Sequence, residues 1–121
     1  MIERHSLLVA IVDYGLGNLF SVKHAFEHVG LPAVVTPCKK TILEADAVVL
    51  PGVGAFGNAM EALQRSDLIS PLKEVAASGK ALFGICLGMQ LLMTESHEFG
   101  LHRGLDIVPG SVLLLEPETT A

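Results

Sequence analysis

The chain has 121 residues, of which 50% are apolar and 17% charged, and its formal net charge at pH 7 is -5. This length suits one domain, and so large an apolar fraction excludes an intrinsically disordered chain. The longest basic run is the pair Lys39-Lys40, so the sequence lacks the positive patch that binding to nucleic acid phosphates requires.

The first thirteen residues, MIERHSLLVAIVD, contain Glu3 and Arg4 and an apolar run only at residues 7–12. That run is too short to span a membrane, and no small-residue cleavage signature follows it. We therefore expect no signal peptide and a cytoplasmic location. In that compartment, Cys38 and Cys86 are expected to be reduced thiols and not a disulfide.

The first predicted elements are two strands with a helix between them. Residues 7–13 form a segment of strand length that is apolar up to Val12, which is typical of a parallel strand covered on both faces. After the turn YGLGN, apolar residues recur at spacings of three and four up to Val29, which predicts a helix with Asn18 as its N-cap. Residues 33–36 predict the second strand.

The same alternation continues along the chain. Residues 47–52 predict a third strand that ends in a Pro-Gly turn, and residues 56–63 and 68–76 each place apolar side chains on one helical face. Residues 81–85 predict a fourth strand, with a short helix after Cys86. Residues 111–115, SVLLL, predict a fifth strand.

Strands that alternate with helices predict an α/β fold, a doubly wound and mostly parallel sheet built by right-handed crossovers. Five such strands suit the flavodoxin-like order 2-1-3-4-5. No linker or repeat interrupts the pattern, so residues 1–121 are expected to form a single domain. Ligands bind at the carboxyl ends of such strands, so the loops at 14–18, 52–57 and 86–88 should share one rim.

The most informative stretch is Gly84-Ile85-Cys86-Leu87-Gly88, a G-x-C-x-G pattern where a strand should turn into a helix. It is the thiol counterpart of the G-x-S-x-G nucleophile elbow, in which glycines avoid collisions around a strained pivot residue. A buried cysteine packing as a small hydrophobe is the alternative. The flanking glycines favour an exposed nucleophile.

Attack by a thiolate on a carbonyl creates an oxyanion, which preorganised N–H donors must stabilise. The backbone amide of Leu87, next to the nucleophile, is one predicted donor. The second is expected from the glycine-rich segment at 50–57, where Gly52 and Gly54 allow a close backbone approach. Acyl transfer is the chemistry that this combination predicts.

Other kinds of site are disfavoured. Gly15-Leu16-Gly17 resembles the start of a dinucleotide-binding fingerprint, but Phe20 stands where the third glycine belongs. His97 and His102 lack the spacing and the cysteine partners of a metal site. We therefore predict no cofactor and no metal, and we assign no role to Cys38.

Three segments, IVDYGLGNL, LPGVGAFGNAM and GICLGMQLL, closely resemble the class I (triad-type) glutamine amidotransferases. Within that family they are most similar to the glutaminase subunits of imidazole glycerol phosphate synthase, which act in histidine biosynthesis. The resemblance covers nearly the whole chain. It implies an enzyme that hydrolyses L-glutamine to glutamate and supplies ammonia to a cyclase subunit with a (β/α)8 barrel fold.

The resemblance also implies roles for individual residues. Cys86 matches the nucleophile that forms a γ-glutamyl thioester, and Gln90 and Glu98 match positions that hold glutamine. The oxyanion hole corresponds to Gly52, Val53, Gly54 and Leu87. The segment facing the cyclase partner corresponds to Tyr14, Gly15 and Asn18.

The chain departs from the family pattern in one respect. Family members continue to a histidine and a glutamate that complete the triad, whereas none of the chain's histidines matches that motif: His5, His24, His28, His97 and His102. We therefore expect a domain truncated at its C-terminal end, which is inactive alone if no base replaces the histidine. Two alternatives stay open: a catalytically incomplete flavodoxin-like module that self-associates through its sheet edge, and a thiol redox protein.

Overall fold

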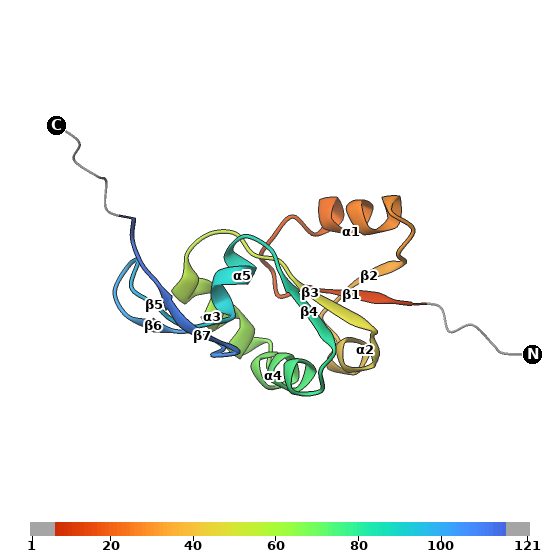
Figure 1. Cartoon of the computed structure of the whole chain (residues 1–121). Helices are drawn as coiled ribbons and strands as arrows, with labels where there is room; N and C mark the ends of the chain where they lie inside the picture. Colours follow the sequence, from red (N-terminus) through yellow and green to blue (C-terminus); the bar gives the residue numbers. More distant parts are fainter. Residues whose placement is uncertain (1–6, 116–121) are drawn as a thin grey trace, which may run out of the picture.

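The computed structural model describes residues 7–115, so His5 and the last six residues lie outside the described part. Its main sheet has four parallel strands in the order β2-β1-β3-β4 (Figure 1). This order confirms the predicted doubly wound arrangement for the first four strands. Their bounds are β1 Val9–Val12, β2 Ala33–Thr36, β3 Ala47–Leu50 and β4 Ala81–Gly84.

Five helices accompany these strands within the described part of the chain. Four of them agree with predicted helices, whereas the fifth, α2, begins directly after Cys38 and was not among the predicted elements. Their bounds are α1 Leu19–His28, α2 Lys39–Glu44, α3 Phe56–Arg65, α4 Ile69–Ala77 and α5 Leu87–Leu91.

The two faces of the main sheet carry different layers because successive side chains of a strand point to opposite sides. Val9 and Ile11 of β1 pack with residues of α1, whereas Ala10 and Val12 belong to a larger core that includes residues of the other four helices. Figure 1 shows α1 on one side of the sheet and α2 and α4 on the other. The larger core therefore lies on the side away from α1.

A second, smaller sheet follows α5, with three strands in the order β6-β5-β7. It consists of β5 Met93–Ser96, β6 His102–Arg103 and β7 Val108–Val112, with β5 antiparallel to β6 and parallel to β7. In Figure 1 it lies at one end of the main sheet, next to α3 and α5.

The predicted fifth strand is therefore corrected in both extent and place. The strand spans Val108–Val112 and not residues 111–115, and it pairs with β5 instead of joining β4. Pro109 and Gly110 lie inside this strand, where the register with β5 shifts at an irregularity. An edge strand with a bulge can contain a proline, because the missing N–H is not needed there.

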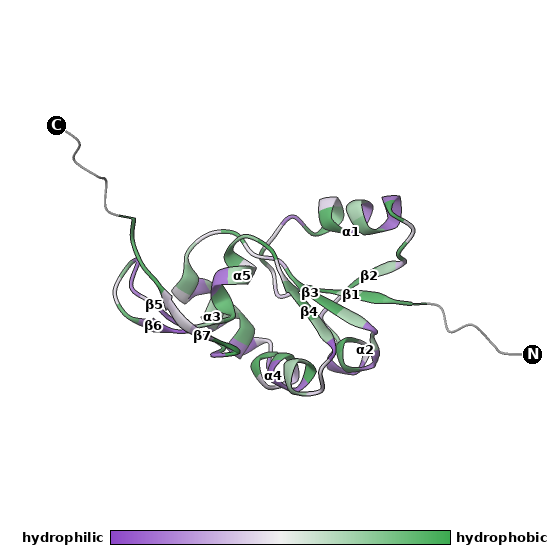
Figure 2. Ribbon diagram, viewed as in Figure 1, coloured by the Kyte–Doolittle hydropathy of each residue, from purple (hydrophilic) through white to green (hydrophobic). Residues whose placement is uncertain are grey.

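Hydropathy differs between the main sheet and the smaller sheet (Figure 2): β1 is hydrophobic along its length, whereas the region of β5 and β6 carries hydrophilic residues. All four residues of β1 are buried, whereas four of the five residues of β7 are exposed. Among residues 7–115, no helix has the length and apolar content needed to cross a membrane.

Candidate active site

Cys86 lies between β4 and α5, at the abrupt strand-to-helix turn that the glycine pattern predicts. Its backbone has φ 53° and ψ -121°, and its thiol is free and exposed. A positive φ at a non-glycine residue is strained and persists only where the surroundings enforce it. This geometry agrees with an elbow and excludes the alternative of a buried cysteine in the core.

The glycines two residues to either side have the steric role that the sequence predicts. A Cβ on Gly84 would lie 2.7 Å from Cα of Met89, and a Cβ on Gly88 would lie 1.8 Å from the carbonyl oxygen of Leu50. That carbonyl also accepts a hydrogen bond from the backbone N–H of Ile85, at 3.0 Å. The carboxyl end of β3 thus contacts the turn on both sides of Cys86.

The segment after β3 runs directly beside this turn. Gly52 is buried, and a Cβ there would lie 2.9 Å from the backbone nitrogen of Gly88 and 3.2 Å from Cβ of Leu87. Gly54 has φ +96°, which favours glycine, and no atom lies within 4 Å of its Cβ position. The Gly52-Val53-Gly54 segment and the first turn of α5 are therefore neighbours, as the shared rim requires.

Several backbone amides at this junction have no protein acceptor among the described residues, and those of Val53 and Leu87 are among them. Within residues 7–115, neither the N–H of Val53 nor that of Leu87 donates a hydrogen bond to another residue. As whole residues, Val53 is 54% exposed and Leu87 is 7% exposed. Unpaired N–H groups beside an exposed nucleophile are the arrangement that oxyanion stabilisation needs.

Tyr14, predicted to face a partner, has a different position. It is only 6% exposed, and its hydroxyl donates a hydrogen bond of 2.6 Å to the carbonyl of Pro51, directly before Gly52. Burial raises the pKa of Tyr14 from 10.0 to about 12. Tyr14 thus supports the start of the Gly52-Val53-Gly54 segment from the core side. Tyr14 is the chain's single tyrosine. A buried tyrosine hydroxyl normally needs a hydrogen-bond partner, and this need was the signal in the sequence that could have indicated a supporting role.

The two residues predicted to hold glutamine lie on different elements. Gln90 is half-buried on α5, and Glu98 lies in the loop between β5 and β6. Glu98 lines a cavity of about 180 Å³ together with Ala55, Glu61 and His102, and neither Cys86 nor Gln90 is among the residues that line it. The structure thus brings Glu98 to the start of α3, which follows the Gly52-Val53-Gly54 segment.

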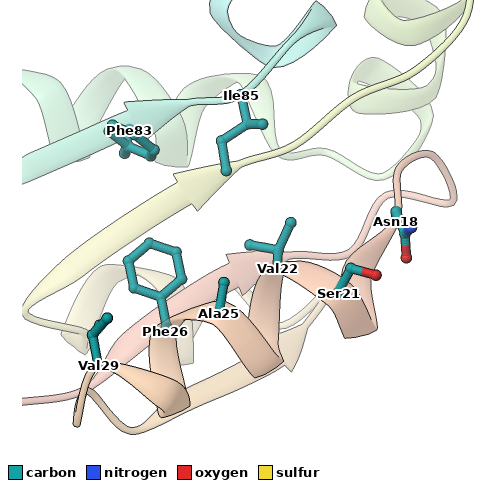
Figure 3. A pocket seen from close by; sticks show the side chains of 8 residues that line it. All are labelled: Asn18, Ser21, Val22, Ala25, Phe26, Val29, Phe83 and Ile85. Carbon is teal, nitrogen blue, oxygen red and sulfur yellow. The ribbon is translucent and has the colours of Figure 1, made fainter.

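A larger, apolar groove of about 380 Å³ lies between α1 and β4 (Figure 3). Phe83 and Ile85 of the β4 side face Val22, Ala25 and Phe26 of α1, and Asn18 lies at one end of the groove. Asn18 directly precedes α1 as its N-cap residue, but it makes no side-chain cap hydrogen bond. Of the three residues predicted to face a partner, Gly15 and Asn18 keep accessible surface.

The second thiol, Cys38, is exposed at the start of α2. The pKa of Cys38 is lowered by the backbone amide of Thr41, then by the Thr41 hydroxyl and the backbone of Lys40. Cys38 is thus a second free and exposed thiol, distant in sequence from the elbow. Within residues 7–115, no group of three or more His, Cys, Asp or Glu side chains could hold a metal ion.

Comparison with known proteins assigns a family. The model of the class-I glutamine amidotransferases matches residues 10–108. Over 105 residues the chain is 52% identical to the imidazole glycerol phosphate synthase subunit HisH of Geobacter sulfurreducens and 53% identical to that of Geobacter metallireducens. In each comparison the match covers 87% of this chain and 50% of the relative. The chain thus spans about half the length of these curated relatives.

The fold has a counterpart among solved structures. A crystal structure of a glutamine amidotransferase superposes with a TM-score of 0.73 at 20% sequence identity, covering 87% of this chain and 55% of that one. At this identity the likeness shows the fold alone. It agrees with the flavodoxin-like amidotransferase fold predicted from the sequence.

Gly88→Ala tests the contact between β3 and α5. The added methyl group would overlap the Leu50 carbonyl, and overpacking of this kind destabilises by about 1–3 kcal/mol. Denaturant unfolding should therefore show a loss of that size. Met89→Ala, on the exposed side of the same helix, should change the free energy of unfolding by less than about 0.5 kcal/mol. Equal stability of the two variants would contradict the contact.

Tyr14→Phe tests the hydrogen bond to Pro51. Below pH 10 the variant should lose about 1 kcal/mol of stability, because the Pro51 carbonyl loses its donor. The raised pKa of Tyr14 means that the folded protein favours the neutral phenol, so the wild-type protein should lose stability as the pH rises from 10 to 12. Between pH 10 and pH 12 the free energy of unfolding should fall less steeply for Tyr14→Phe than for the wild-type protein. Parallel pH profiles would show that Tyr14 titrates alike in both states.

Proposed function

The chain belongs to the class-I glutamine amidotransferases, and from that membership we propose that it is a glutaminase subunit of imidazole glycerol phosphate synthase. It would hydrolyse L-glutamine and supply ammonia for histidine biosynthesis. The observation that carries the proposal is Cys86, a free and exposed thiol in a strained backbone between β4 and α5. Relatives about 50% identical, named as this subunit, support the choice of reaction.

The proposed chemistry begins with attack by the Cys86 thiolate on the side-chain carboxamide of glutamine. A C–S bond forms and the carbonyl electron pair moves to oxygen; when that pair returns, the C–N bond breaks and the nitrogen leaves with a proton as ammonia. The γ-glutamyl thioester is then hydrolysed by water, which yields glutamate and regenerates the thiol. The chain's own contribution is the nucleophile and its electrostatic surroundings.

We assign the oxyanion hole to the amides of Val53 and Leu87. Both lack a protein acceptor within residues 7–115, and Gly52 packs against the first turn of α5. Removing one such donor typically lowers catalysis by about 10²–10³-fold. The general base is not assigned to any of these 121 residues, because none of the histidines matches the position that the resemblance implies.

Substrate and partner contacts complete the proposal. Gln90 and Glu98 would hold glutamine, with the carboxylate of Glu98 suited to its α-ammonium group. The exposed part of the loop around Gly15 and Asn18 would face a (β/α)8 cyclase subunit that receives the ammonia. We place the protein in the cytoplasm as one amidotransferase domain, without a metal or cofactor.

A second candidate function is self-association. The side chain of Phe83 is 59% exposed on the groove between α1 and β4, and within the described residues β4 pairs on one side only, with β3. An uncovered apolar face and a free strand edge favour pairing with a second copy. This alternative competes with the glutaminase proposal only if Cys86 fails to react with glutamine analogues.

Selective labelling tests the nucleophile. A glutamine-shaped diazoketone, 6-diazo-5-oxo-L-norleucine, should modify Cys86 in a saturable reaction that L-glutamine prevents, as read by peptide mass spectrometry. Iodoacetamide provides the control, because it alkylates an exposed thiol such as Cys38 without substrate recognition. Diazoketone labelling at Cys38 and not at Cys86 would contradict the proposal.

Light scattering tests self-association. If the groove and the edge of β4 bind a second copy, the protein should show a concentration-dependent dimer mass, and Phe83→Lys should shift it to the monomer mass. Phe20→Lys, which replaces an exposed phenylalanine outside the groove lining, is the matched control. A monomer mass at every concentration would exclude the second candidate.

A further inference from the structure

The loop that carries Glu98 is a short hairpin whose ends are held together. Ser96 of β5 and His102 of β6 are paired in antiparallel register, with residues 97–101 between them. Ser96 is 1% exposed, and its Oγ accepts a hydrogen bond of 3.3 Å from the backbone N–H of Glu98. The backbone at Glu98 is thus fixed from the β5 side by a buried hydroxyl.

His102 fixes the same loop from the other side. Its Nε2 lies 3.0 Å from the carbonyl oxygen of Phe99, the residue after Glu98. Its ring packs on α3 at Gly57, where a Cβ would lie 2.7 Å from both Nδ1 and Cε1 of the imidazole. Only a residue without a side chain at position 57 leaves room for this ring.

A second close contact joins the hairpin to the same helix. A Cβ on Gly104 would lie 2.2 Å from the carbonyl oxygen of Met93 and 2.9 Å from Cζ of Phe56. Phe56 is 2% exposed and is the first residue of α3. The hairpin therefore packs against the first turn of α3 at two points where glycine allows close approach.

The first turn of α3 is also the continuation of the proposed oxyanion segment, since Gly54 is followed by Ala55 and then by α3. The short segment from Val53 to Gly57 thus connects the Val53 amide with the hairpin that carries Glu98. Ala55, Gly57, Glu98 and His102 line the same cavity of about 180 Å³. A change in the position of the His102 ring would move Glu98 relative to Val53.

We propose that His102, seated on Gly57, is a positioning residue that sets the distance between Glu98 and the Gly52-Val53-Gly54 segment and so determines the affinity for the amino acid substrate. This inference rests on the proposed function, because Glu98 must hold glutamine for its position to matter. His102 itself takes no part in proton transfer. It acts on substrate binding through the carbonyl of Phe99.

The experiment measures diazoketone labelling of Cys86 in the Cys38→Ser background, separating the half-saturation constant from the maximal rate. His102→Ala should raise the half-saturation constant about tenfold, which corresponds to about 1.4 kcal/mol, and leave the maximal rate within about twofold. His102→Gln retains an N–H donor and should stay within about threefold of the parent. The matched control is His97→Ala, an exposed histidine of the same hairpin that pairs with Glu95.

A double-mutant cycle isolates the contact with Gly57. Gly57→Ala should raise the half-saturation constant by displacing the ring, and the same change in the His102→Ala background should have no further effect, because the ring is gone. Iodoacetamide alkylation of Cys86 should proceed at one rate in all variants. That alkylation rate reports the surroundings of the Cys86 thiol at the turn between β4 and α5. It would change if the substitutions damaged the fold there.

The outcomes separate the two proposals. Labelling of the parent that does not saturate, or that glutamine does not prevent, would overturn the proposed function and with it this inference. If labelling of the parent is saturable, two results would overturn the role of His102 alone. One is an unchanged half-saturation constant in His102→Ala, and the other is additive effects of Gly57→Ala and His102→Ala. If His102→Ala does not fold, His102→Gln and Gly57→Ala decide by the same criteria.

Discussion

The contact between Gly88 and the carbonyl of Leu50 is the constraint on which the rest of this site depends. The backbone of α5 lies so close to the end of β3 that no side chain fits between them. Because the same carbonyl accepts the N–H of Ile85, the chain must turn from strand to helix within the four residues 85–88. The strained backbone of Cys86 and the exposure of its thiol follow from that geometry.

The same contact determines what lies opposite the thiol. The segment after Leu50 continues past the first turn of α5, where Gly52 packs against Leu87 and Gly88, and Tyr14 holds the carbonyl of Pro51 from the core. The exposed thiol of Cys86 and the unpaired main-chain amides of Val53 and Leu87 therefore lie at one junction of two strand ends. Preorganisation of this kind costs no reorganisation during the reaction, which is why it suits acyl transfer.

Much of this could be predicted from the sequence, and the failures have physical causes. Continuous apolar runs identified β1 to β4, and the crowding around Gly84 and Gly88 identified the elbow. The small sheet was missed because β5 and β6 are short and mostly polar, so that no periodicity distinguishes them. The apolar run ending at Leu115 suggested a place in the main sheet for the last strand, β7, which is largely exposed. The six residues of α2 are too few to show a helical period. Contacts made through glycine, such as that between Gly57 and His102, leave no local pattern.

The most direct test of the account is a crystal structure of the protein after reaction with 6-diazo-5-oxo-L-norleucine. The account predicts a covalent bond to Sγ of Cys86 and the ketone oxygen of the adduct about 3 Å from the backbone nitrogens of both Val53 and Leu87. An adduct whose oxygen points into solvent, with neither amide within hydrogen-bonding distance, would contradict it.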